Sequence, residues 1–411
     1  DLASGKVMNR LIQGDVGSGK TIVALSALMN AAFSGYQSVF MAPTEVLALQ
    51  HYETISKLLK ENHINLNAAL LTGSMTALEK KVVYNALMDG KIDILIGTHA
   101  VFQEKVKYKN LGLVVTDEQH RFGIKQRAAL ALKGNEPHMI VMSATPIPRT
   151  LALIVYGDMD VSIIDEVPAR RKPIKNAVVD ETYRDNAYKF IEKEVRQGHQ
   201  AYVICPMVEY SEGLDANNVT DYSEMLKEVL SEDITVGMLH GQMSPTKKNE
   251  IMQNFASGNI DVLVSTTVVE VGVDVPNATV MMVEDANRFG LAQLHQLRGR
   301  VGRGDSQSYC IFVANNKSET AMERLEVLKS SNNGFEIAEK DLSFRGPGEF
   351  MGIRQSGVLS FKNFDIYRDA DIAKKALKTV EEIIEGKRAI TEAEMNRLKD
   401  NCSVLKGGIL L

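Results

Sequence analysis

The most informative chemical pattern in the chain is the segment Gly14-Asp15-Val16-Gly17-Ser18-Gly19-Lys20-Thr21. Residues 7–13 predict a buried strand before it, and the Ala- and Leu-rich residues 21–33 predict a helix after it. In this setting the backbone N–H groups of the loop bind phosphate oxygens, because the glycines let them curl around the anion and the helix dipole points at it. The residues predicted to bind a nucleotide here are Gly14, Gly17, Ser18, Gly19, Lys20 and Thr21.

The second candidate for chemistry is the carboxylate pair Asp117-Glu118, which follows the apolar residues 113–115. Lys20 would reach the β- and γ-phosphates, while the Thr21 hydroxyl and Asp117 would hold the Mg²⁺ that bridges them. Glu118 can then orient or deprotonate the attacking water. The alternative is an ordinary solvated strand end, which the phosphate-binding loop upstream disfavours. ATP and Mg²⁺ are the predicted cofactors.

Two arginines of the second half, Arg300 and Arg303, lie in the segment Gln296-Leu297-Arg298-Gly299-Arg300-Val301-Gly302-Arg303. Because they are three residues apart, we expect them to share one face of a helix. Two guanidinium groups there suit a transferring phosphate and would accelerate its cleavage by ~10³-fold or more. The alternative is a surface cluster of arginines. This half contains no second phosphate loop, so the arginines are predicted to complete the site of the first half.

The elements that position these residues alternate between strand and helix in both halves. Such alternation predicts parallel sheets with helices on both faces, in which chemistry lies at the carboxyl ends of the strands. Residues 166–173 combine prolines with charged residues and are typical of a linker. Residues 211–218 are polar and are predicted to form a mobile loop, whereas Ser244-Pro245 is predicted to begin a helix.

We therefore expect an α/β chain of four parts. Residues 1–167 would form a first domain with the phosphate loop and Asp117-Glu118. Residues 174–316 would form a second domain with the two arginines. Residues 317–360 would form a helical hairpin and a loop, and residues 361–411 a C-terminal helical segment.

Composition limits the classes of protein that fit. The chain has 411 residues, 45% hydrophobic and 24% charged, a net charge of −5 and a pI near 6.0, so any contact with nucleic acid must come from a local surface. Its three cysteines form no Cys-x-x-Cys pair, which indicates buried thiols in a reducing compartment. No apolar run approaches the ~20 residues of a membrane helix. The start at Asp1 is not that of a signal peptide, and we expect the chain to be a fragment.

The segments Gly19-Lys20-Thr21, Asp117-Glu118-Gln119-His120 and Ser143-Ala144-Thr145 resemble motifs I, II and III of the superfamily-two helicases. The resemblance implies two RecA-like domains in tandem that close on ATP, with Arg300 and Arg303 as arginine fingers. It also implies that Asp274 and Gln296 contact the nucleotide. The positions that it assigns to nucleic-acid contacts are Pro43, Thr44, Gly97, Thr98, Ser143, Thr145, Thr266 and Thr267. The adenine-reading segment of this superfamily precedes the first strand, and we expect most of it to lie outside the chain.

The C-terminal part of the chain indicates which family within this superfamily it resembles. Residues 318–329 and 335–342 predict two helices, and a glycine-rich loop over residues 341–357 follows. The loop sequences Arg-Gly-Pro-Gly-Glu-Phe and Arg-Gln-Ser-Gly most resemble those of the RecG family. In that family this hairpin and loop form a translocation motif. By this resemblance Arg345, Arg354 and Gln355 couple ATP hydrolysis to movement along DNA.

The resemblance implies an ATP-driven translocase on double-stranded DNA that remodels stalled replication forks and branched junctions, including Holliday junctions. The implied partners are branched and duplex DNA and single-stranded-DNA-binding protein, and a cytoplasmic monomer without membrane contact is expected. The wedge domain of the family is expected to lie outside this chain. Three alternatives remain at this point: the motor of a transcription-repair coupling factor, an RNA helicase, and an ATP-binding scaffold with little turnover.

Overall fold

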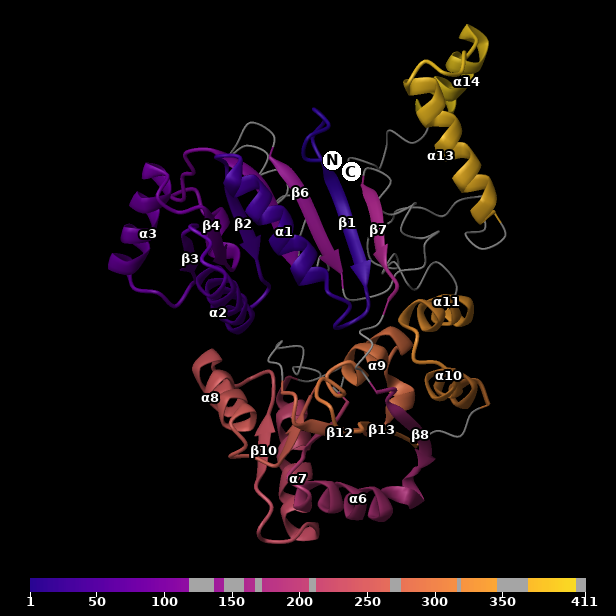
Figure 1. Ribbon diagram of the computed structural model, residues 1–411. Helices are drawn as coiled ribbons and strands as arrows, with labels where there is room; N and C mark the ends of the chain where they lie inside the picture. Colours follow the sequence, from indigo (N-terminus) through magenta and orange to yellow (C-terminus); the bar gives the residue numbers. More distant parts are fainter. Residues whose placement is uncertain are drawn as a thin grey trace.

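Two parallel β-sheets follow one another along the chain in the computed structural model (Figure 1). The structure describes residues 1–117, 137–143, 159–166, 172–206, 212–266, 275–315, 319–345 and 369–403. The first sheet has seven strands in the order β3-β4-β2-β5-β6-β1-β7, and the second has six in the order β10-β11-β9-β12-β13-β8. All described strand pairs are parallel, which confirms the prediction of two parallel-sheet α/β domains in tandem.

The first sheet is covered by helices on both faces. Its strands are β1 (Asn9–Gly14), β2 (Gln37–Met41), β3 (Ala68–Leu71), β4 (Ile94–Gly97), β5 (Leu111–Asp117), β6 (His138–Ser143) and β7 (Asp160–Ile164). Phe40 of β2 packs with α1 (Lys20–Phe33) and α2 (Glu45–Glu61), whereas its neighbour Val39 packs with α3 (Ala77–Asp89) and the 3₁₀ helix η1 (His99–Phe102). Successive side chains of a strand point to opposite faces, so each strand of this sheet anchors both helical layers.

The second sheet repeats this arrangement. Its strands are β8 (Lys175–Asp180), β9 (Gln200–Ile204), β10 (Val236–Leu239), β11 (Val262–Ser265), β12 (Ala278–Val283) and β13 (Tyr309–Ala314). On one face lie α6 (Arg184–Arg196) and α7 (Glu212–Val229), and on the other lie α8 (Pro245–Ala256) and α9 (Leu291–Arg298). Short 3₁₀ helices, η3 (Glu181–Tyr183) and η5 (Ala286–Arg288), follow β8 and β12.

In the part of the chain that the structure describes, four helices follow the second sheet. The hairpin of α10 (Glu319–Ser330) and α11 (Gly334–Arg345) packs on α9, and α13 (Ala370–Ile384) and α14 (Glu392–Ser403) lie outside both sheets (Figure 1). The predicted helical pair is thus confirmed. α11 extends to Arg345, so residues 341–345, which were predicted to begin the loop, are helical, and the rest of the predicted loop lies outside the described residues.

Local sequence signals account for several helix boundaries. Thr76 and Glu79 form a reciprocal capping box at the start of α3. Ser244 caps α8 by accepting a hydrogen bond from the Lys247 amide, with Pro245 in the first turn, as predicted. The predicted loop over residues 211–218 is wrong from residue 212 onward, because α7 begins at Glu212. Extending an existing helix is much easier than nucleating one, which outweighs the weak helix propensity of these polar residues.

Two of the cysteines are buried free thiols, as the sequence indicated. Burial raises the pKa of both Cys205 and Cys310 to about 12. Among the described residues, no helix has both the length and the apolar composition needed to cross a bilayer.

Candidate nucleotide site

The loop between β1 and α1 needs glycine at three positions. Gly17 and Gly19 have φ of 82° and 94°, a left-handed conformation that other residues resist. At Gly14 an added Cβ would lie 3.0 Å from the Ile164 carbonyl oxygen and would collide with the Ser18 hydroxyl. The backbone therefore curls tightly against the sheet edge, as a phosphate-binding loop must.

The first turn of α1 is open to an anion. Gly19 is its N-cap, no side chain caps the helix, and no acidic residue lies in its first turn. The positive end of the helix dipole and the early backbone N–H groups therefore favour phosphate at this point. Thr21 belongs to the same turn, where its hydroxyl would be available to a metal ion bound with the phosphates.

Lys20 is held inside the loop. Its side chain is buried, and its amino group donates to the carbonyl oxygens of Gly14 and Asp15, each at 2.8 Å. A buried ammonium group requires such partners. Phosphate oxygens entering the loop would offer it charged acceptors, which form stronger hydrogen bonds than carbonyls do. The residues present therefore fit a nucleoside triphosphate.

Three neighbouring strands bring further polar residues to this edge of the first sheet. β6 lies between β5 and β1, with Asp117 opposite Met142 and Ser143 opposite Gln13. The carboxyl ends of these strands, and with them Asp117, Ser143 and Gly14, therefore lie together. Among the described residues no group of three or more His, Cys, Asp or Glu side chains could hold a metal ion by itself. Mg²⁺ usually takes only one or two carboxylates and fills its shell with phosphate and water oxygens, so Asp117 and Thr21 fit it.

Four of the predicted nucleic-acid residues of the first domain, Pro43, Thr44, Gly97 and Thr98, lie at the ends of the next pair of strands, β2 and β4. Met41 of β2 pairs with Gly97 of β4, which places Pro43-Thr44 beside Gly97-Thr98. Thr44 caps α2 by accepting a hydrogen bond from the Leu47 amide at 3.3 Å. In the second domain Thr266 follows β11, and its buried hydroxyl has no hydrogen-bond partner among the described residues.

The two domains meet at the phosphate loop. His295 of α9 contacts Asp15 with 2.9 Å between Nε2 and Oδ1, and His295 is almost fully buried there. Next to this contact, a Cβ added at Gly299 would lie 3.0 Å from Cγ2 of Val16. Figure 1 shows α9 on the side of the second domain that faces the first. The segment that carries Gln296, Arg300 and Arg303 is therefore adjacent to the phosphate loop.

The predicted helical arrangement of Arg300 and Arg303 is wrong. α9 ends at Arg298, and Gly302 has a φ of 76°, which a helix cannot accommodate. Beyond the helix, Nε of Arg303 donates to the Gly299 carbonyl oxygen at 3.2 Å. A turn rather than a helix face therefore carries both arginines, while Gln296 lies within α9.

Several predicted site residues lie outside the described residues, and their roles stay predictions: Glu118, Thr145, Thr267, Asp274, Arg354 and Gln355.

Sequence reasoning missed three side chains near the site. His51 of α2 has its Nε2 atom 3.5 Å from Oδ2 of Asp117, which is a longer contact than a hydrogen bond. His295 and Arg298 lie at the domain contact and received no role. Their spacing of three residues on one helix was the available signal, since such residues are neighbours on its surface.

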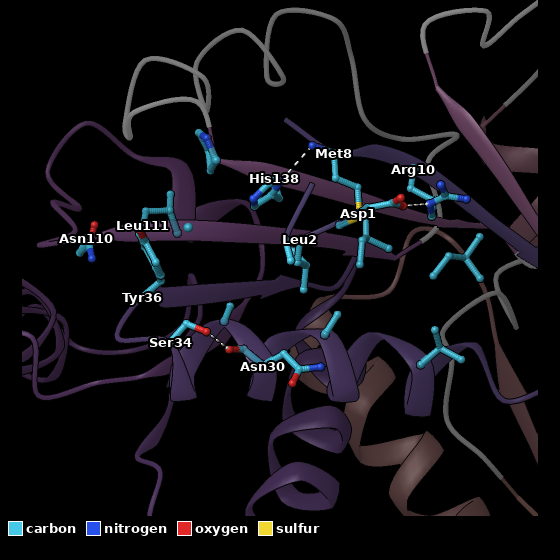
Figure 2. Close-up of a pocket in the computed structure, with 18 of the residues that line it drawn as sticks. Asp1, Leu2, Met8, Arg10, Asn30, Ser34, Tyr36, Asn110, Leu111 and His138 are labelled. Atoms are coloured by element: carbon cyan, nitrogen blue, oxygen red, sulfur yellow. Dashed lines mark hydrogen bonds and ion pairs between the residues drawn. The ribbon is translucent and has the colours of Figure 1, made fainter. Parts of the chain in front are cut away.

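A cavity of about 1280 Å³ lies at the opposite edge of the first sheet. Figure 2 shows it between α1 and the starts of β1, β5 and β6, with Met8, Asn30, Leu111 and His138 among its lining residues. These strands begin where the cavity lies and end at the phosphate loop. The cavity is therefore separate from the nucleotide site.

Comparison with protein families agrees with this geometry. Residues 2–154 match the DEAD/DEAH box helicase model, and residues 184–305 match the helicase conserved C-terminal domain. Residues 331–406 match the C-terminal part of domain 3 of the ATP-dependent DNA helicase RecG. Over its whole length the chain is similar to the RecG helicases. It corresponds to the motor region of RecG, because the matched helicase domains and the RecG-specific segment follow one another along its whole length.

Individual RecG proteins support the same assignment. The ATP-dependent DNA helicase RecG of Bacillus subtilis is 48% identical over 410 residues, which are 100% of this chain and 60% of that protein. RecG of Thermotoga maritima is 48% identical over 94% of this chain and 49% of its own length. The chain thus spans about half the length of these relatives.

Solved structures agree at the level of the fold. The structure of RecG bound to a three-way DNA junction is 44% identical, with a TM-score of 0.75 over 91% of this chain and 48% of that one. Mss116p bound to single-stranded RNA is 19% identical with a TM-score of 0.60, a likeness of fold alone.

Proposed function

We propose that this chain is an ATP-driven motor that translocates on double-stranded DNA and remodels stalled replication forks and branched junctions. The observation that carries the proposal is the contact between the phosphate loop and α9, at Asp15 and His295 and at Val16 and Gly299. It supports a single nucleotide site with contributions from both domains. The RecG structure bound to a three-way junction supports branched DNA as the substrate.

The proposed chemistry divides between the two domains. Bound Mg²⁺–ATP would supply the anhydride bond whose cleavage drives the motor. Lys20 and the N–H groups of the loop bind the phosphates, while Asp117 and Thr21 hold Mg²⁺ and Glu118 orients the attacking water. From the second domain, Arg300 and Arg303 stabilise the charge that develops on the transferring phosphate.

Movement would follow from closing and opening of the same contact. The first domain offers Pro43-Thr44 and Gly97-Thr98 to one stretch of nucleic-acid backbone, and the second offers Thr266. Because the nucleotide site lies between the domains, its occupancy changes the spacing of these two grips. A chain with a net charge of −5 binds DNA through such local surfaces rather than through its overall field.

ATPase rates measured side by side with forked DNA, linear duplex, single-stranded DNA and RNA test the proposal. We expect strong stimulation by forked and linear duplex DNA and weak stimulation by RNA. Preferential stimulation by RNA would favour an RNA helicase. ATP binding without turnover on any nucleic acid would favour an ATP-binding scaffold.

A further inference from the structure

Arg298 is a fully buried cation that the proposed chemistry does not use. Its guanidinium group donates to the carbonyl oxygens of Leu328 at 3.2 Å, Ser331 at 2.8 Å and Asn332 at 3.2 Å. These carbonyls lie at the end of α10 and in residues 331–333, which connect α10 to α11. A helix C-terminus carries unpaired carbonyls and the negative end of the dipole, so it suits a cation. Arg298 therefore fastens α9 to the helical hairpin.

The same guanidinium group orients His295. Its NH2 atom lies 2.6 Å from Nδ1 of His295. Because arginine only donates, Nδ1 must be the acceptor and the ring proton must lie on Nε2. That atom is 2.9 Å from Oδ1 of Asp15, so His295 donates to the phosphate loop of the other domain. The His295 imidazole thus accepts a hydrogen bond from Arg298, which contacts the hairpin, and donates one to Asp15 of the phosphate loop.

Asp15 connects this contact to Lys20. Its carboxylate also accepts from the Val16 amide at 2.7 Å, and its carbonyl oxygen accepts from Nζ of Lys20 at 2.8 Å. The carbonyl further accepts from the Ser18 amide at 3.1 Å. Any rearrangement of Lys20 and the loop around a phosphate must therefore act on the residue that His295 contacts.

Residues 331–333, which Arg298 contacts, are also held by hydrogen bonds on their other side. The Asn332 side chain accepts from that of Asn176 at 3.1 Å, and Asn333 caps α11 through the Phe335 amide at 2.9 Å. Residues 331–333 are therefore held between the second sheet and α11, so a displacement of Arg298 acts on both helices of the hairpin.

We infer that Asp15, His295 and Arg298 form a positioning relay that transmits the state of the phosphate loop to the α10–α11 hairpin. The inference rests on the proposed function, since it supplies the physical link between ATP turnover and the part of the chain that would move DNA. None of the three acts on the reacting atoms through this relay. The contact of His295 with Asp15 crosses the domain boundary, and His295 also contacts Arg298, so it is the residue to change.

Hydrogen–deuterium exchange of residues 328–336 tests the relay without DNA. Exchange is measured with and without Mg²⁺ and a non-hydrolysable ATP analogue, in the wild-type chain and in His295→Ala, His295→Gln and His199→Ala. Glutamine offers an NH2 group as donor and a carbonyl oxygen as acceptor, so it can replace the imidazole. His199 is an exposed histidine of the same domain whose contact is with Asn277, and it serves as the matched control.

The relay predicts that the analogue changes exchange of residues 328–336 several-fold in wild type, His295→Gln and His199→Ala. The change should be lost in His295→Ala, while the affinity for the analogue stays within about threefold of wild type. A full response in His295→Ala, or equal loss in His295→Ala and His295→Gln, contradicts the relay. Binding of the analogue without any response in the wild type also contradicts it. Failure of the wild type to bind the analogue contradicts the proposed function itself, and the relay with it.

Discussion

At the scale of single residues, the position of each side chain in the site follows from the hydrogen-bond partners and the exposure that its charge requires. Lys20 is buried and uses two carbonyls of its own loop, which a phosphate would exchange for charged oxygens. Asp117 ends a strand whose other residues are almost all buried, so its carboxylate is presented at the sheet edge. These two residues could be predicted from the sequence because a glycine-rich loop and a strand-end carboxylate are local patterns.

Changing Lys20 and Glu118 separates binding from cleavage. Lys20→Ala should weaken ATP affinity by about tenfold or more, because it removes a charged hydrogen bond to phosphate. Glu118→Gln should bind ATP normally and cleave it very slowly, because glutamine orients but cannot deprotonate water. Equilibrium binding of a fluorescent ATP analogue and steady-state ATPase rates measure the two effects. Wild-type turnover in Glu118→Gln would remove that carboxylate from the mechanism.

At the scale of elements, helix ends decide where the second domain presents its residues. The strands, most helices and the caps at Thr76 and Ser244 follow from hydrophobic periodicity and capping residues, which act over a few positions. The end of α9 was predicted wrongly because a spacing of three was given more weight than the glycines at positions 299 and 302. The start of α7 was missed because polar composition alone does not distinguish a loop from a solvated helical turn.

The close approach of α9 to the phosphate loop depends on Gly299. Gly299→Ala should push against Val16 and lower ATPase activity roughly five- to hundredfold, since overpacking costs about 1–3 kcal/mol. Adding Val16→Ala should restore part of the activity, because it removes the methyl group that the new Cβ would meet at 3.0 Å.

Gly73→Ala is the matched control for this change. There an added Cβ also meets its neighbour at 3.0 Å, but that neighbour is the flexible carboxylate of Glu45. Activity should therefore stay near wild type. Equal losses of ATPase activity in Gly73→Ala and Gly299→Ala, or no rescue by Val16→Ala, would show that activity does not depend on close packing of Gly299 against Val16.

At the scale of the whole molecule, the proposed function depends on contacts that the sequence did not predict. His295 and Asp15 are 280 positions apart, and no local pattern pairs them. Arg298 likewise reaches 33 residues along the chain to Ser331. The local motifs could be read from the sequence, whereas the contacts between residues far apart along the chain are seen only in the fold.

The glycine-rich segment after α11 should couple hydrolysis to DNA movement. Arg354→Ala or Gln355→Ala, made in a protein that includes the wedge domain, should leave DNA-stimulated ATPase largely intact while fork unwinding falls. The reason is that Arg354 can bind a phosphate or carboxylate with a fixed fork, far along the chain from the nucleotide residues. ATPase and unwinding rates on the same forked DNA measure the split. Parallel loss of both activities would indicate a structural role.

The central claim is that the second domain completes the nucleotide site of the first. The most direct measurement is the turnover number and ATP dissociation constant of Arg303→Ala in the presence of duplex DNA. We expect Arg303→Ala to lose turnover by about 10³-fold and to bind ATP within about threefold of wild type, because an arginine finger acts on the transition state. Turnover and affinity both at wild-type values would contradict it.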